Sequence, residues 1–174
     1  GASRIAMSMH KQEMWESFKR YGFGEASGVS FPGESSGYFR HYSQWQPLDH
    51  ATMGFGYGLS TSITQLARAY AVIANEGRLL DLSLIRKEVD SRPANQISRH
   101  VMKSSTARQM IQMMTEVVGP EGTAQLAAIP GYQVAGKTGT ARKSIAGGYQ
   151  KDDYVAVFAG MAPASNPRLV MAVM

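Results

Sequence analysis

The pattern of apolar residues predicts three amphipathic helices, the first of them near the start of the chain. Between Ser3 and Tyr21, apolar side chains recur at the spacing of one helical face. This face holds Met7, Met14, Trp15 and Phe18. Gly22 follows directly, and a glycine in this place commonly ends a helix in the left-handed conformation. We therefore expect one helix from Ser3 to Tyr21, capped by Gly22.

Two further stretches combine the helical period with residues that start and stop helices. Ser62 and Gln65 have the spacing of a capping box, and Asn75-Glu76-Gly77 would close the helix that follows. A third helix would begin at Ser105 and end at Gly119-Pro120. The apolar sides would be formed by Ile63, Leu66, Ala67, Tyr70 and Ile73 in the second helix and by Ile111, Met114 and Val118 in the third.

The C-terminal part of the chain changes to the pattern of β-strands. Three runs, Tyr132 to Thr140, Tyr154 to Ala162 and Arg168 to Met174, are expected to be strands. The connections, residues 142–153 and 163–167, are too short to hold a crossover helix, so the strands should be antiparallel neighbours. Helices followed by an antiparallel meander predict an α+β fold in which helices cover the sheet.

The remaining segments show no clear period. Residues 22–58 are rich in Gly, Ser, Pro and aromatic residues, and such a stretch inside a compact domain is usually functional or tightly packed. Its aromatic residues predict packing: Phe23, Phe31, Tyr38, Phe39, Tyr42, Trp45, Phe55 and Tyr57. Residues 79–98 are mixed, and we expect a short strand there and an exposed connection around Pro93.

The composition is that of a globular protein. Of the 174 residues, 44% are apolar and 18% are charged, and the length suggests one domain. The net charge is +5, but Lys and Arg are spread without a run, so no nucleic-acid partner is predicted. A cationic surface suits an acidic polymer or an anionic membrane face equally well. No apolar run reaches the ~18 residues that cross a bilayer, and no signal peptide is recognisable.

Neither a metal site nor a cofactor is predicted. The absence of cysteine excludes a disulfide framework and a thiolate metal site. The four histidines have no partner at i+4 and no carboxylate pattern that indicates metal ligands. We expect them in surface or loop positions: His10, His41, His50 and His100.

The candidate chemistry lies in the first strand run, where Lys137-Thr138-Gly139-Thr140 forms a compact set for holding an anion. Lys137 supplies a point charge, and the hydroxyls of Thr138 and Thr140 supply donors. Gly139 lets another backbone come close, and an exposed edge here could bind an extended peptide as one more strand. The alternative is a strand that ends in a polar turn with a solvated lysine. Because roughly one chain of this length in ten contains Lys-[Ser/Thr]-Gly by composition, the motif needs support from the rest of the chain.

The same residues match the phosphate-binding pattern Gly-x4-Gly-Lys-Thr, from Gly131 to Thr138. That loop works only between a buried strand and the N-terminus of a helix. Residues 127–130 make a poor strand, and residues 140–149, with Gly147-Gly148, make a poor helix. The later run of residues 154–162 has no Asp that would hold magnesium. Nucleotide binding is therefore disfavoured.

Two serine motifs can be set aside on similar grounds. Gly33-Glu-Ser-Ser-Gly37 has the spacing of a nucleophile elbow, but Pro32 interrupts the strand that an elbow needs, so we expect a polar loop. Ser8-Met-His-Lys11 matches Ser-x-x-Lys, in which lysine could activate a serine on one helix face. It lies in an ordinary amphipathic helix, and no Ser-x-Asn follows it before Lys137, so we interpret it as a chance match.

Five segments in order extend the case beyond the Lys-Thr-Gly motif. They are Val29-Ser-Phe-Pro-Gly-Glu-Ser-Ser-Gly37, Phe55-Gly-Tyr-Gly-Leu59, Thr64-Gln-Leu-Ala-Arg-Ala-Tyr-Ala71, Gly136-Lys-Thr-Gly-Thr-Ala141 and Ala159-Gly-Met-Ala-Pro-Ala164. Together they resemble the transpeptidase domain of class B penicillin-binding proteins, most of all its division-specific D,D-transpeptidases. The resemblance covers essentially the whole chain. It implies the serine transpeptidase fold that penicillin-binding proteins share with β-lactamases.

The resemblance implies acyl transfer on peptidoglycan stem peptides that end in D-Ala-D-Ala, and binding of β-lactams, which mimic that end. In this family a serine from Ser-x-x-Lys attacks the penultimate D-Ala carbonyl, releases the last D-Ala and passes the acyl group to an amine of a neighbouring strand. By match to the third family motif, Lys137 would help hold the substrate carboxylate and tune proton transfer. Thr138 and Thr140 would hydrogen-bond that carboxylate, and the Thr140 N–H would be one of two oxyanion-hole donors.

Two further residues receive roles from the same resemblance. Gly139 would have to stay small so that the substrate can run along the strand edge. Tyr57, in the Phe-Gly-Tyr-Gly segment, is a candidate aromatic wall of the cleft, although ordinary core packing explains it nearly as well.

The chain departs from the family pattern because usable Ser-x-x-Lys and Ser-x-Asn motifs are both missing. The resemblance therefore implies that the nucleophilic serine, its lysine and half of the oxyanion hole lie upstream of Gly1. We also expect the domain to be incomplete at its C-terminal end, because residues 168–174 stop inside an apolar strand. Alone, the chain should neither acylate nor bind penicillin covalently.

The resemblance also implies a cellular setting. The parent protein would be anchored in the bacterial inner membrane by a helix outside these residues, with this domain in the periplasm. It would work in septal wall synthesis beside membrane proteins of the divisome. The alternatives are a D,D-carboxypeptidase or β-lactam-sensor relative, or a non-catalytic module of the same fold that docks a peptide.

Overall fold

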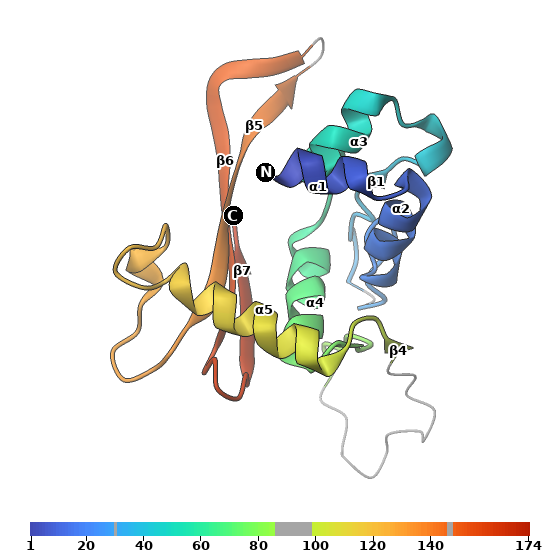
Figure 1. The fold of residues 1–174 in the computed structure, drawn as a ribbon. Coiled ribbons are helices and arrows are strands. Elements are labelled where there is room, and N and C mark those ends of the chain that lie inside the picture. Colours follow the sequence, from blue (N-terminus) through green and yellow to red (C-terminus); the bar gives the residue numbers. More distant parts are fainter. Residues whose placement is uncertain (30, 86–98, 146–147) are drawn as a thin grey trace. The chain divides into compact units, whose positions relative to one another are not determined.

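The computed structural model describes residues 1–29, 31–85, 99–145 and 148–174, and it has the predicted α+β fold (Figure 1). The chain divides into two compact units. The first holds Gly1–Arg68 and Asp81–Ile97, and the second holds Ala69–Leu80 and Ser98–Met174. The predicted connection around Pro93 lies outside the described residues.

The first unit is built around a core of Ala6, Met14, Trp45 and Met53. Its helices are α1 (Ala2–Ser8), α2 (Lys11–Arg20) and α3 (Pro47–Met53). The prediction of one helix from Ser3 to Tyr21 was wrong, because Met9 and His10 have extended backbones that separate α1 from α2. As a result Met7, expected on the buried face, is half exposed. The predicted left-handed glycine is confirmed, since Gly22 has a φ of 89°.

The aromatic stretch of residues 22–58 contains more regular structure than its sequence predicts. It includes β1 (Tyr38–Phe39), the 3-10 turn η1 (Tyr42–Gln44) and α3, and β1 pairs with β2 (Leu59–Ser60). The expected packing holds for Trp45, which is buried, and partly for Phe39 and Tyr42. It was wrong for Phe31 and Tyr38, which are exposed, while Phe55 is also exposed but packs against Tyr57.

Helix α4 (Ile63–Ala74) begins in the first unit with the predicted capping box. The Gln65 N–H donates to Ser62 Oγ at 3.1 Å, and the Ser62 N–H donates to Gln65 Oε1 at 2.9 Å. Gln65 is only 1% exposed, and its Nε2 also donates to the backbone carbonyls of Glu25 and Ser36. The cap therefore also fixes the loop between α2 and β1.

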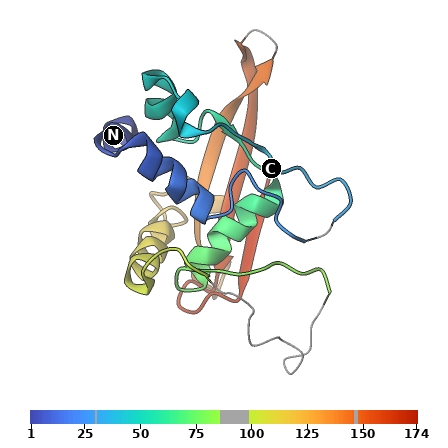
Figure 2. The same cartoon turned by 90° about the vertical axis from the view of Figure 1, so that its right-hand side faces the viewer.

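The second unit is a helix-covered sheet. Its strands are β5 (Ala135–Ile145), β6 (Gly148–Ala162) and β7 (Leu169–Val173), which pair antiparallel in the order β5-β6-β7, as predicted. Helix α5 (Ser104–Glu116) crosses one face of this sheet (Figures 1 and 2). The buried centre consists of Met114, Ala135, Met161 and Ala164, with Tyr70 and Ile73 from the end of α4 against it. The unit also holds the 3-10 turn η3 (Gln125–Ala127) and a short pair, β3 (Arg78–Leu79) with β4 (Arg99–His100).

Two strand boundaries differ from the prediction. Strand β5 begins at Ala135 and not at Tyr132, because Gly131 turns the chain and Tyr132 forms only an isolated bridge to Ile129. Strands β5 and β6 also extend into residues 142–153, which we expected to be a connection. A long hairpin therefore replaces the predicted loop.

Candidate functional site

The predicted Lys-Thr-Gly-Thr motif lies on β5, an edge strand of the three-stranded sheet. In this register Lys137 is opposite Ala159, Thr138 opposite Phe158 and Thr140 opposite Ala156. Among the described strands, β5 pairs with β6 alone, so within the described residues its other edge has no strand partner and is called the open edge. The motif is thus presented on an open strand edge, as the sequence predicts.

The register also fixes which backbone groups face this open edge. The Gln133 carbonyl, two residues before β5, accepts the Ala164 N–H from the β6 side at 2.7 Å. Along an antiparallel pair, successive residues direct both backbone groups alternately toward and away from the partner strand. Gly136, Thr138 and Thr140 therefore direct their N–H and C=O groups away from β6. Consistently, the Thr138 carbonyl accepts a hydrogen bond from Lys137 Nζ at 2.8 Å.

The side chains of the motif leave the strand on two faces. Lys137 is exposed and shares its face with Ala135, which is fully buried against Met114 of α5. Thr138 lies on the opposite face with Phe158, and its Oγ1 is 3.0 Å from Oγ1 of Thr123. The predicted anion-binding set is therefore distributed around the edge of β5.

Two glycines of this strand have opposite surroundings. A Cβ placed on Gly136 would lie 2.6 Å from Cε2 of Phe158, and one on the paired Gly160 would lie 2.9 Å from Cε1 of the same ring. The Phe158 ring thus occupies the space above both glycines. A Cβ placed on Gly139 would meet no atom within 4 Å. Gly136 is required by the fold, whereas no contact among the described residues requires glycine at position 139.

Thr123 contacts the predicted motif, and the sequence does not reveal this contact. It lies fifteen positions before Thr138, after α5, in a turn without strand or helix pattern. Only the fold brings the two hydroxyls together. Both residues line a cavity of about 560 Å³, together with Phe158 and Val173.

Tyr57 belongs to the first unit and the motif to the second. Its ring packs edge-to-face against Phe55, with 5.6 Å between the ring centroids. Its predicted role as a wall of the cleft stays a prediction.

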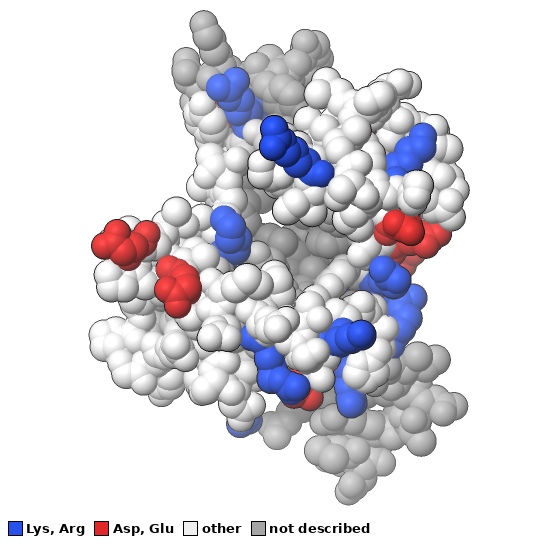
Figure 3. Space-filling model, viewed as in Figure 1, with Lys and Arg blue, Asp and Glu red and all other residues white. Residues whose placement is uncertain are grey.

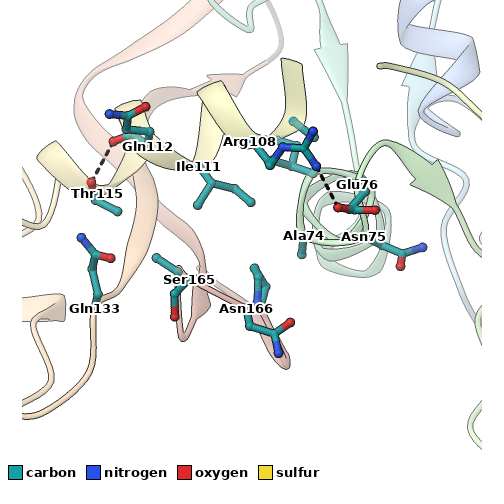
Figure 4. Close-up of a pocket in the computed structure, with 14 residues that line it drawn as sticks. Ala74, Asn75, Glu76, Arg108, Ile111, Gln112, Thr115, Gln133, Ser165 and Asn166 are labelled. Carbon is teal, nitrogen blue, oxygen red and sulfur yellow. Dashed lines mark hydrogen bonds and ion pairs between the residues drawn. The ribbon is translucent and has the colours of Figure 1, made fainter. Parts of the chain in front are cut away.

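A second cavity, of about 530 Å³, lies between α5, the turn after α4 and the β6–β7 turn (Figure 4). Glu76 and Arg108 form an ion pair there, with 3.1 Å between Oε1 and Nη1, and Gln133 and Asn166 also line the cavity. None of the predicted site residues lines it.

The rejected motifs have the geometry expected of chance matches. Strand β5 continues through Thr138 to Ile145, so no helix follows the glycine-lysine-threonine pattern. Ser8 ends α1 and donates to the Ile5 carbonyl at 2.7 Å, while Lys11 begins α2. Ser35 lies in an exposed loop, where its hydroxyl accepts the Gly37 N–H.

Charge and metal-binding potential are modest over the described part of the chain. No group of three or more His, Asp or Glu residues that could hold a metal ion occurs there. The expectation of surface histidines was wrong for His50, which is buried on α3 with its ring centroid 6.1 Å from that of Trp45. Figure 3 shows Lys and Arg side chains scattered over the drawn face among uncharged and acidic ones. Within the same residues, no helix is long and apolar enough to span a membrane.

Comparison with known proteins identifies the family. The family model described as the penicillin binding protein transpeptidase domain matches residues 1–174. The chain belongs to this family. It is 43% identical to the probable peptidoglycan D,D-transpeptidase PbpC of Pseudomonas aeruginosa over 100% of its length, and 37% identical to the peptidoglycan D,D-transpeptidase FtsI of Escherichia coli over 99%. These matches confirm the predicted resemblance.

A solved structure supports the same assignment. The transpeptidase domain of penicillin-binding protein 3 from Burkholderia pseudomallei is 44% identical, and the two folds agree with a TM-score of 0.91 over 99% of the chain. The chain spans 51% of that domain, and about 30% of the PbpC and FtsI polypeptides.

Proposed function

We propose that this chain is the substrate-holding part of a peptidoglycan D,D-transpeptidase. The observation that carries the proposal is the outer edge of β5, which has Lys137 on one face, Thr138 and Thr140 on the other and outward backbone groups between them, in a member of the transpeptidase family. The substrate would be a stem peptide ending in D-Ala-D-Ala, and β-lactams would bind in its place. An extended peptide would lie against the edge as an added strand.

In this proposal each group of the edge has one task. The Lys137 ammonium and the Thr138 and Thr140 hydroxyls hold the terminal carboxylate, since charge-assisted hydrogen bonds are the stronger ones. The Thr140 N–H, which faces away from β6, stabilises the oxyanion. Loss of one such donor typically costs about 2.7–4 kcal/mol of transition-state stabilisation. Gly139 leaves room for the substrate on the Lys137 face.

The attacking serine would come from outside these 174 residues, because their Ser-x-x-Lys match is broken between α1 and α2. Its hydroxyl oxygen would bond to the penultimate D-Ala carbonyl carbon and release the last D-Ala as an amine. An amine of a neighbouring stem peptide would then take the acyl group and free the serine. We propose that the parent is anchored in the inner membrane, faces the periplasm and acts in septal wall synthesis with divisome membrane proteins.

The test compares Lys137→Ala with Lys143→Ala in the full-length protein. Both lysines lie on β5, but Lys143 lies where the register with β6 shifts and forms an exposed ion pair with Asp153, with 3.6 Å between its Nζ and Oδ2. Acylation by a fluorescent penicillin should fall by at least about 100-fold in Lys137→Ala, through loss of a charge-assisted contact and of proton transfer. It should change less than about threefold in Lys143→Ala. Wild-type acylation of Lys137→Ala would remove this lysine from the site.

Two further measurements address the rest of the proposal. The isolated 174-residue chain should carry no penicillin after denaturation, and covalent label on it would show that the nucleophile lies within it. Product analysis separates the alternatives. Cross-linked peptide indicates a transpeptidase, hydrolysed peptide a D,D-carboxypeptidase, and neither product a sensor or docking module.

A further inference from the structure

The contact between Thr123 and Thr138 joins the predicted substrate-binding strand to a turn that has no assigned role. The two Oγ1 atoms are 3.0 Å apart. Each hydroxyl has one proton to donate and two lone pairs that accept. A substrate carboxylate only accepts, so Thr138 can donate to it only if its proton is not already given to Thr123.

Thr123 is held in place by its neighbours on both sides. The Ala124 N–H donates to the Val117 carbonyl at 2.9 Å, and Ala124 is buried with Val118 and Val134. A Cβ on Gly122 would collide with the same Val117 carbonyl, so the turn closes tightly at the end of α5. The Thr123 hydroxyl is therefore presented to β5 from a fixed position, although its side chain is exposed.

Few other side chains around Thr123 and Thr138 could form hydrogen bonds with their hydroxyls. The cavity that both threonines line has no charged residue among its lining residues, and its other walls include Leu126, Phe158 and Val173. Among the described residues that line the cavity, Gln125 is the one other polar residue, and its amide donates to the Pro120 carbonyl.

We propose that Thr123 is a positioning residue that donates its proton to Thr138 Oγ1, so that the Thr138 hydroxyl donates to the substrate carboxylate. The inference rests on the proposed function of β5. In such a chain each hydrogen bond polarises the next, which strengthens the last one. Without Thr123, the Thr138 hydroxyl is free to rotate and give its proton to water.

The experiment uses two variants of the full-length protein and two probes. Thr123→Val removes the hydroxyl and keeps the side-chain shape, and Thr123→Ser keeps the hydroxyl. The first probe is a penicillin with a free carboxylate, and the second is its methyl ester. The second-order acylation rate constant is measured for each pair, together with the separate binding and acylation constants.

For the free acid, Thr123→Val should lower the second-order constant by about 3- to 10-fold, as expected for loss of one hydrogen bond, and mainly through weaker binding. Thr123→Ser should stay within about twofold of wild type. The methyl ester should react equally with the wild type and with Thr123→Val. An equal loss for both probes would mean a merely structural role, and no loss would exclude the relay. Either result overturns the inference.

Failure of this inference can be told from failure of the proposed function. If the wild type itself is not acylated, or if Lys137→Ala reacts normally, the function of β5 is wrong. If those tests succeed and Thr123→Val still reacts with the free acid at the wild-type rate, only the role of Thr123 is wrong.

Discussion

Gly139→Ala separates the needs of the substrate from the needs of the fold. Because no atom of the described residues lies within 4 Å of a Cβ at this position, alanine should add a methyl group without a clash. Glycine inside a strand is unfavourable by roughly 0.5–1 kcal/mol relative to alanine, so the variant should be as stable as wild type or slightly more stable. The new methyl group shares its face with the Lys137 side chain, two residues away.

The expected loss of activity follows from that placement. If the substrate carboxylate reaches Lys137 across Gly139, the methyl group weakens or removes one charge-assisted hydrogen bond. Such a bond contributes about 1.5–3 kcal/mol, which corresponds to a fall in acylation of about 10- to 150-fold. Gly136→Ala is the matched control. Its Cβ would lie 2.6 Å from Phe158 Cε2, and overpacking of this kind typically costs about 1–3 kcal/mol of stability.

The assay measures both quantities in the full-length proteins. Acylation is followed with a fluorescent penicillin, and local stability by hydrogen exchange of peptides from β5 and β6. Gly139→Ala should lose acylation with unchanged exchange, whereas exchange in Gly136→Ala should accelerate. Wild-type acylation of Gly139→Ala would show that the substrate does not cross this face. Faster exchange in Gly139→Ala would refute the reasoning from open space.

Three other predictions test the edge of β5 and the first unit. Thr140→Pro removes an N–H that faces away from β6, so it should cut acylation by about 100- to 1000-fold and leave the sheet intact. Thr140→Val also loses the hydroxyl but keeps that N–H, so equal acylation rates for the two variants would show that the amide is not an oxyanion donor. Gln65→Met leaves two loop carbonyls without their donor, which should cost about 2–3 kcal/mol, so peptides from residues 22–37 should exchange about 30- to 150-fold faster. The control Gln12→Met, at an exposed position of α2, should leave this exchange unchanged. The Gln46 N–H, and then Arg40, hold the pKa of Asp49 below its usual value. The stability that ionised Asp49 contributes is therefore complete above its unfolded pKa of about 3.9 and is lost as the pH falls through the lower folded pKa. The melting temperature of Asp49→Asn should therefore fall less steeply below pH 4 than that of the wild type.

The sequence predicted those elements whose signals are local. The capping box of Ser62 and Gln65 and the three antiparallel strands depend on residue spacing and short connections, and both were confirmed. The break between α1 and α2 was missed because neither Met9 nor His10 is a helix breaker. Packing in the core determines the break, since Ala6 and Met14 pack into the same cluster from two separate helices. Tertiary packing overrode a continuous helical period.

In the candidate site, too, the sequence predicts the residues whose signal is local and misses those that only the fold brings together. Lys137 to Thr140 could be named from the sequence because the motif is contiguous and a strand alternates its side chains predictably. Thr123 could not, because its partner Thr138 is fifteen residues away and is brought close only by the turn after α5. His50 shows the reverse error, since a residue expected in a loop is buried beside Trp45.

The placement of Lys137, Thr138 and Thr140 depends on the register between β5 and β6. Shifting β5 by one residue against β6 would exchange its two faces and turn the N–H of Thr140 toward β6. The paired glycines Gly136 and Gly160 resist this shift, because the Phe158 ring lies above both and any side chain brought beneath it would collide. Phe158 thus acts on the site through the pairing of the two strands. By fixing the register, it determines which face carries the Lys137 ammonium and which edge carries the Thr140 amide.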